Sequence, residues 1–214
     1  MLMVFDRQRF FAAIRNAPFS GKLSGGQVQG TELVLDQFER IAPDGDARHL
    51  AYMLATAFHE TAATMQPVRE TLAASDDAAI IILDRAYAAG RLGQVSSPYW
   101  RRDAEGKSWL GRGLVQLTHR RNYEAMSAVT GINLVARPER AMEPEVSATI
   151  LVEGMLQGSF TGRRLSRYFN AQSEDWVGAR AVINGRDRAE LIAGYGRSFN
   201  AALSVSRIEP VAVG

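Results

Sequence analysis

The sequence predicts a mainly α-helical protein, and three observations lead to this fold class. Apolar residues recur at spacings of three and four in nearly every segment, as on the buried face of a helix. No series of alternating apolar and polar residues indicates a sheet, so we expect at most a minor β element. The 214 residues, 46% of them apolar, suffice for one substantial core or two closely packed lobes.

Four helices are predicted in the first half of the chain. Each follows a capping or loop residue and carries apolar residues at helical spacing. They extend from Asp6 to Ile14, from Val28 to Ile41, from Asp46 to Phe58, and from Asp76 or Asp77 to Tyr87. Pro18, the turn at residues 43–46, and Gly90 separate or end them.

The second half begins with a glycine-bearing, aromatic segment at residues 93–113, which we expect to be irregular. Further helices are predicted from a Thr118 cap to Val129, from Pro144 to Met155, from a Ser173 cap to Ile183, and from Asp187 to Phe199. We expect a single catalytic domain, with residues 1–45 packed on residues 46–204 and a loose tail at 205–214.

Composition excludes several classes of protein. The chain has no cysteine, so thiol catalysis and disulfides are ruled out. No apolar run reaches the roughly 18 residues that a membrane-spanning helix needs, and the first residues lack the pattern of a secretory signal. We therefore expect synthesis in the cytoplasm without a signal peptide and no membrane insertion. We also expect a monomer.

Arginine supplies almost all of the positive charge. The formal net charge is +2, and only Lys22 and Lys107 are lysines. The arginine pairs at 101–102, 120–121 and 163–164 could contact an anionic envelope or nucleic acid, but pairs of this kind are more often solvated helix faces. We expect no nucleic-acid partner.

Glu60 is the first candidate catalytic residue. It ends the apolar helix and lies on the same face as Met53 and Ala57. Partial desolvation favours the protonated form of a carboxyl group, which is what protonation of a glycosidic oxygen requires. The alternative is an ordinary glutamate at a helix end.

Glu70 is the candidate partner of Glu60. Pro67 separates it from the preceding helix, so we expect a polar loop in which Glu70 is solvated and stays ionised beside Arg69. A general acid and a general base are the pair that glycoside cleavage uses. Glu105, in the irregular segment, is the alternative base.

The segment from Gly111 to Asn122 resembles the wall of a polar cleft. Its glycines permit close backbone approach, and Gln116, Thr118 and Asn122 both donate and accept hydrogen bonds. It lacks the glycine spacing of a nucleotide-binding loop. Aromatic side chains in the preceding loop, Trp100 among them, could stack on sugar rings or instead pin the loop to the core.

Other catalytic motifs fail. His59-Glu60 begins a zinc-protease motif, but Ala63 stands where its second histidine belongs. Ser159 lies one place too early for a nucleophile elbow. We therefore expect no metal and no cofactor, and we interpret His59 and His119 as structural histidines beside the cleft.

Over roughly residues 50–202 the chain resembles the chitinase-like glycoside hydrolases of family 19, in particular their short bacteriophage endolysins. The pieces that carry the resemblance are Phe58-His59-Glu60-Thr61, Gly111 to Thr118, Asn122-Tyr123, Ile183-Asn184-Gly185, and Asp187-Arg188 leading to Tyr195. The resemblance implies a lysozyme-like, two-lobed α-helical fold and hydrolysis with inversion.

Site roles follow from the resemblance. It implies that Glu60 is the general acid, Glu70 the general base, and Thr118 the hydroxyl residue that helps to hold the attacking water. Inversion requires widely separated carboxylates, about 6.5–9.5 Å or more. The resemblance also implies substrate-binding or neighbouring roles for Gln116, Asn122, Tyr123, Asn184 and Arg188.

The chain departs from the family pattern at several places. Ala62-Ala63 replaces a frequent glycine pair, and Arg186 follows Asn184-Gly185 where a second glycine is usual. Leu110 and Leu114 also replace expected aromatic and proline residues. These departures concern the loop path and the subsites.

The motifs do not distinguish peptidoglycan from chitin, because both polymers contain β-1,4-linked N-acetylhexosamines. The missing signal sequence and cysteines favour an endolysin that cuts peptidoglycan glycan strands after the membrane is permeabilised, during lysis of the host cell. Chitin hydrolysis is the alternative, and an inactive glycan-binding protein is the second alternative.

Overall fold

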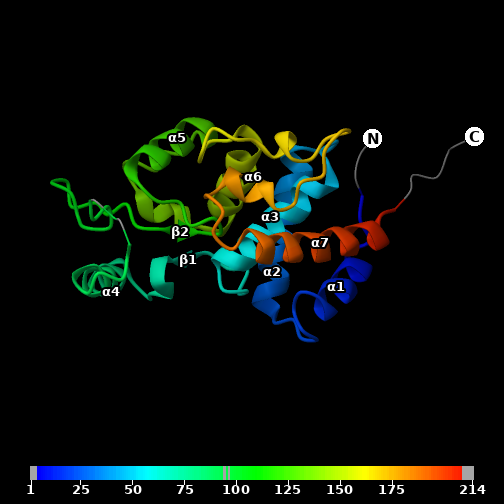
Figure 1. The fold of residues 1–214 in the computed structure, drawn as a ribbon, viewed down its shortest axis with the longest axis horizontal. Helices are drawn as coiled ribbons and strands as arrows, with labels where there is room; N and C mark the ends of the chain where they lie inside the picture. Colours follow the sequence, from blue (N-terminus) through cyan, green and yellow to red (C-terminus); the bar gives the residue numbers. More distant parts are fainter. Residues whose placement is uncertain (1–3, 94, 96, 209–214) are drawn as a thin grey trace, which may run out of the picture.

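The computed structural model describes residues 4–93, 95 and 97–208 and is mainly α-helical, as predicted (Figure 1). Within these residues the α-helices are α1 (Arg7–Asn16), α2 (Gly25–Ile41), α3 (Ala47–Glu60), α4 (Asp76–Ala88), α5 (Arg120–Thr130), α6 (Pro144–Gln157) and α7 (Ala189–Ser206). Short 3-10 helices are η1 (Glu70–Leu72), η2 (Pro138–Met142), η3 (Leu165–Arg167) and η4 (Gly178–Val182). None of the helices in the described part is long and apolar enough to cross a membrane.

Several predicted helix ends are confirmed. Asp6 and Asp46 accept hydrogen bonds from first-turn amides of α1 and α3, and Pro144 begins α6. Gly131 ends α5 in a left-handed conformation. The cap of α4 is Ser75, with Asp76 in the first turn.

Other predicted helix starts are wrong. Thr118 does not cap α5: His119 occupies the cap position with φ 66° and makes no side-chain capping bond. Ser173 does not cap a helix to Ile183, because only the 3-10 helix η4 forms there, and Asp175 accepts the Gly178 amide proton at 2.8 Å. The last helix begins two residues later than expected, at Ala189.

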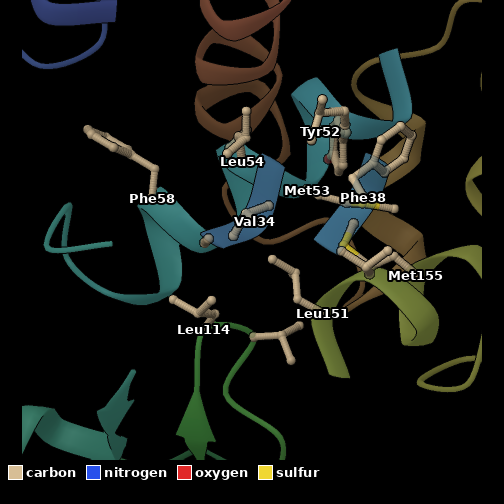
Figure 2. Packing of buried hydrophobic residues seen from close by; sticks show 14 of the residues in the cluster. Val34, Phe38, Tyr52, Met53, Leu54, Phe58, Leu114, Leu151 and Met155 are labelled. Atoms are coloured by element: carbon tan, nitrogen blue, oxygen red, sulfur yellow. The ribbon is translucent and has the colours of Figure 1, made fainter. Parts of the chain in front are cut away.

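Helix α3 is the centre of the main core. Its residues His49–Phe58 are all buried, so the helix is surrounded by protein on every face. Figure 2 shows its side chains packed between α2 and α6, with Leu114 closing the cluster from the segment before α5. Packing on all sides fixes the end of α3, where Glu60 lies.

A second, smaller hydrophobic cluster lies around α4. It joins Ala79 and Leu83 to Trp100 and Leu110. A two-stranded antiparallel sheet, β1 (Val68–Arg69) with β2 (Arg112–Gly113), pairs Val68 with Gly113 between this part and the α3 core (Figure 1). The described residues thus form two clusters, as the two-lobed alternative expected.

The N-terminal segment packs on the rest of the chain: α1 contacts α7, and α2 contacts α6. The start of the predicted loose tail is ordered, because Arg207 pairs with Phe5 and the Ile208 amide donates to the Val4 carbonyl at 2.9 Å. Residues 209–214 of that tail lie outside the described residues.

Candidate active site

A polar cleft of about 450 Å³ lies at the end of α3. Four segments of the sequence line it: Glu60, residues 115–119 with 121–122, Phe160 with Thr161, and residues 183–185. Of the predicted site residues, Glu60, Gln116, Thr118, Asn122 and Asn184 line this cleft. The end of the core helix α3, the start of α5 and three loop segments therefore bring together residues that the sequence separates by up to 125 positions.

Glu60 is the last residue of α3, and the chain turns sharply after it. The Ala62 amide donates to the His59 carbonyl at 3.2 Å, and the Ala63 amide donates to the Phe58 carbonyl at 2.7 Å. This is the Schellman pattern of helix termination, which favours glycine because it needs a left-handed residue. Ala62 adopts φ 49° and Ala63 φ 65°. The two alanines therefore take up the conformation for which glycine is usually selected.

The surroundings of Glu60 differ from the expected apolar ones. Arg180, on η4, donates from Nη1 to Glu60 Oε1 at 2.9 Å. The side chains of Arg180 and Glu60 are only 4% and 17% exposed. The Arg180 Nε atom also donates to the Asp187 carbonyl at 3.2 Å, which fixes the guanidinium. Glu60 is thus held by a buried cation.

Arg180 is a site residue that the sequence argument missed. The resemblance pointed to Arg188 as the basic residue near the carboxylates, but Arg188 is exposed before α7 and does not line the Glu60 cleft. A signal was present: Arg180 stands among Val177, Ala179 and Val182, and a lone arginine in an apolar segment is rarely buried without a partner.

Glu70 is fixed by two hydrogen bonds beside the wall of the cleft. Its Oε1 atom accepts from the Tyr99 hydroxyl at 2.7 Å, and its Oε2 atom accepts from the Gly111 amide at 2.7 Å. The Glu70 amide donates in turn to the Gly111 carbonyl at 2.7 Å. Tyr99, one of the aromatic residues of the loop, packs against the cluster around α4, as the loop-pinning alternative expected, and its hydroxyl also orients this carboxylate.

Gly111 allows Glu70 to meet the cleft wall. A Cβ atom at Gly111 would lie 3.3 Å from Glu70 Oε2, 2.8 Å from Gln116 Oε1 and 3.2 Å from Thr118 Cγ2. Three predicted site residues therefore surround one α-carbon. Since Gln116 and Thr118 also line the Glu60 cleft, Glu70 is adjacent to the same site.

The other base candidate is placed differently. Glu105 lies in the exposed part of the loop, where its carboxylate pairs with Lys107 at 2.9 Å. Neither Glu105 nor Glu70 is among the residues that line the Glu60 cleft. Of the two candidates, only Glu70 is adjacent to residues of the cleft wall.

A buried arginine anchors the strand next to Glu70. The Arg112 side chain is fully buried and donates to Asp76 at 2.6 Å, and Arg69 donates to the same carboxylate at 2.7 Å. Burial raises the pKa of Asp76, but the hydrogen bonds and charge of Arg112 and Arg69 outweigh that effect and hold the pKa below its usual value. This network joins α4 to both strands at the base of the Glu70 loop.

The polar side chains of the cleft wall differ in how many of their hydrogen-bonding atoms are already used within the protein. Gln116 uses both amide hydrogens on the Val68 and Gly113 carbonyls, at 2.9 and 3.1 Å, so it holds the loop and offers Oε1 to a ligand. Asn122 donates to the Thr118 carbonyl at 2.8 Å. Asn184 is exposed and accepts from the Gly185 amide at 2.8 Å.

Tyr123 and Trp100 are corrections to the predicted binding set, because both are fully buried. The Tyr123 hydroxyl accepts from Arg112 at 2.8 Å and donates to the Leu110 carbonyl at 2.9 Å, and burial raises its pKa to about 12. The Trp100 indole donates to Asp84 at 2.8 Å. Both stabilise the loop from within, so neither contacts an occupant of the cleft.

The two histidines flank the carboxylates. Burial lowers the pKa of His59, with Glu60 opposing and Arg180 adding to the effect. Burial also lowers the pKa of His119, whose ring lies 4.3 Å from that of Tyr99. His119 lines the cleft, whereas His59 does not.

The described residues contain no group of three or more His, Asp or Glu side chains arranged to hold a metal ion. In comparisons with known proteins, no protein-family model matches the chain, and no curated protein matches it.

Proposed function

We propose that the protein is a glycoside hydrolase that cleaves β-1,4 linkages between N-acetylhexosamines in bacterial peptidoglycan, with inversion, as an endolysin of the family 19 type. The observation that carries the proposal is the pairing of carboxylates at one cleft: Glu60 lines it, and Glu70 is hydrogen-bonded beside its wall. A volume of about 450 Å³ suits a few sugar rings.

In the proposed reaction Glu60 takes up a proton from solvent before cleavage and then gives that proton to the leaving glycosidic oxygen. Arg180 then stabilises the carboxylate that forms, and this stabilisation grows as the proton leaves. Because the guanidinium is already fixed by the Asp187 carbonyl, little reorganisation is needed during the reaction.

Glu70 takes a proton from the attacking water, whose oxygen bonds to the anomeric carbon as the glycosidic bond breaks. The two hydrogen bonds from Tyr99 and Gly111 orient the Glu70 carboxylate for this step. The Thr118 hydroxyl is not used to cap α5, which leaves it for the water. Gln116, Asn122 and Asn184 supply polar groups for the sugar.

The position of Arg121 favours an anionic glycan over chitin as the substrate. It lines the cleft, and no carboxylate among the described residues forms an ion pair with it. Peptidoglycan carries carboxylates on its peptides and on muramic acid residues that bear no peptide, whereas chitin carries none. A cation in the cleft would favour the first polymer.

The test compares reducing ends released from purified peptidoglycan and from colloidal chitin by the wild type, Glu60→Gln and Glu70→Gln. We expect wild-type activity on peptidoglycan and a loss of about 10²- to 10⁴-fold in both variants. Glu153→Gln is the matched control, since Glu153 accepts a hydrogen bond from Gln157 on α6 and lines none of the cavities described here. Full activity of Glu60→Gln would show that Glu60 is not the general acid. A wild type that is inactive on both polymers would refute the proposal that the protein is an enzyme.

Three further measurements complete the test. NMR of the first product detects its anomeric configuration, and retention of configuration would contradict the inverting mechanism. Mass spectrometry of the fragments identifies the bond that is cut. A fall in turbidity of permeabilised bacteria on adding the protein would support a role in lysis.

A further inference from the structure

A second cavity, of about 870 Å³, adjoins the Glu60 cleft. Gly185 lines both, and the second cavity continues over Arg186, residues 188–191, parts of the segment from Asp175 to Ala181, Tyr168 and Arg163. The Thr161 hydroxyl contacts the Ala181 and Val182 carbonyls, at 2.7 and 3.1 Å. Because Thr161 lines the cleft and Ala181 lines the second cavity, these bonds hold the two in a fixed relation.

Three arginines give the second cavity its charge. Arg163, Arg186 and Arg188 line it and are exposed, and none forms an ion pair with another described residue. Two carboxylates, Asp175 and Glu190, also line the cavity, so the formal charge of its lining is +1. Neither carboxylate forms an ion pair with the three arginines in the described part of the chain, and Asp175 accepts the Gly178 amide hydrogen at 2.8 Å.

Arg163, Arg186 and Arg188 differ from other exposed arginines in lining one cavity together. Some arginines elsewhere pair with carboxylates, as Arg48 does with Asp46, whereas Arg85 and Arg197 are exposed and line none of the cavities described here. Arg188 is moreover held in a left-handed conformation, φ 53°, immediately before α7. Unpaired guanidinium groups around a cavity are well suited to bind carboxylates, because their N–H groups match the two oxygens.

We infer that the second cavity binds the carboxylates of a peptide branch on a glycan strand whose sugar backbone occupies the Glu60 cleft. This inference rests on the proposed function and narrows its substrate to peptide-substituted glycan. The shared Gly185 edge lets one continuous ligand reach both regions. Plain chitin, without charged branches, would leave the second cavity empty.

The experiment measures binding directly, so that it does not depend on turnover. A soluble peptidoglycan disaccharide bearing its acidic tetrapeptide, and the same disaccharide without peptide, are titrated calorimetrically into wild type and into Arg163→Ala/Arg186→Ala. The control is Arg85→Ala/Arg197→Ala, which removes the same charge from two exposed arginines that do not line the cavity.

We expect the wild type to prefer the peptide-bearing ligand, and the cavity variant to bind that ligand about 3- to 30-fold more weakly, as for the loss of two exposed charge contacts. Binding of the peptide-free disaccharide should not change, and the difference should shrink at high salt. The control should bind like the wild type.

Equal affinity of the wild type for both ligands, or an equal loss in the control variant, would overturn the inference. Hydrolysis of peptide-free glycan strands is measured separately. If the protein cleaves peptide-free strands and shows no preference for peptide-bearing ligand, the proposed function stands. The proposed role of the second cavity in binding peptide carboxylates is then refuted. Absence of activity on every glycan refutes the function, whatever the binding shows.

Discussion

The Glu60–Arg180 ion pair should be strongly coupled, and a double-mutant cycle can measure the coupling. Arg180→Met leaves Glu60 without its cation, and Glu60→Gln leaves Arg180 with a neutral acceptor. Removing one partner of a buried ion pair costs about 3–5 kcal/mol. Glu60 is 17% exposed at a cleft, so water can replace part of the loss. We therefore expect about 2 kcal/mol for Arg180→Met.

For Glu60→Gln we expect about 1 kcal/mol, because a charged hydrogen bond becomes a neutral one while Arg180 keeps the Asp187 carbonyl. In the double variant no charge is left unpaired. Its destabilisation should thus fall short of the sum by about 1–2 kcal/mol.

Urea unfolding at neutral pH, followed by tryptophan fluorescence, gives the four free energies. The control cycle uses Arg140 and Glu143, an exposed pair whose side chains are 31% and 44% exposed, for which we expect a coupling below about 0.5 kcal/mol. If the Glu60–Arg180 cycle is additive to within about 0.5 kcal/mol, the buried ion pair does not hold the site as argued.

Three further predictions concern the backbone and the histidines. Ala62→Gly should raise the free energy of unfolding by about 0.5–1 kcal/mol in urea, since the strain of φ 49° exceeds the added entropy of the unfolded chain; destabilisation would contradict this. Gly111→Ala should lower kcat about 10²-fold with an unchanged circular dichroism spectrum, because the new Cβ would lie 2.8 Å from Gln116 Oε1 and displace that side chain. A fully active variant would show that Gln116 can move aside without loss of function. Burial lowers the pKa of His49 below 6.5, so the unfolded chain takes up its proton first and stability should fall as the pH drops through 6.5; Tm at pH 7.5 and 5.5 checks this, and His49→Gln should flatten the dependence.

Helical periodicity predicted the fold class because it reports burial directly. The helix before Glu60 is apolar on all sides, and it is the central helix α3. Start signals were less reliable where a neighbouring residue has an unusual backbone conformation. Thr118 has the chemistry of a cap, but His119 at φ 66° takes the cap position and Thr118 faces the cleft.

The candidate site was predicted best where residues lie on one continuous motif. Gln116, Thr118 and Asn122 come from one segment and line one cleft. Contacts between residues far apart in the sequence could not be predicted in this way. Arg180 lies 120 residues from Glu60, and no local pattern relates the two. Tyr123 could not be recognised as buried, because a tyrosine in an amphipathic helix fits either face.

Backbone strain gives independent support for the position of the site. Among the described residues, non-glycine residues with positive φ are Ser20, Ala62, Ala63, Met65, Thr71, Leu72, Gln116, His119 and Arg188. All except Ser20 lie shortly after Glu60 or Glu70, in the cleft wall, or beside the second cavity. Each such conformation costs about 1–2 kcal/mol, and glycine would relieve it. Strain of this kind persists where the surrounding structure imposes it, and it gathers at functional sites. Gln116 and His119 line the Glu60 cleft, and five more strained residues follow Glu60 or Glu70 within five positions in the sequence. The strained conformations therefore favour the segments that carry the two carboxylates and the cleft wall, without reference to any family.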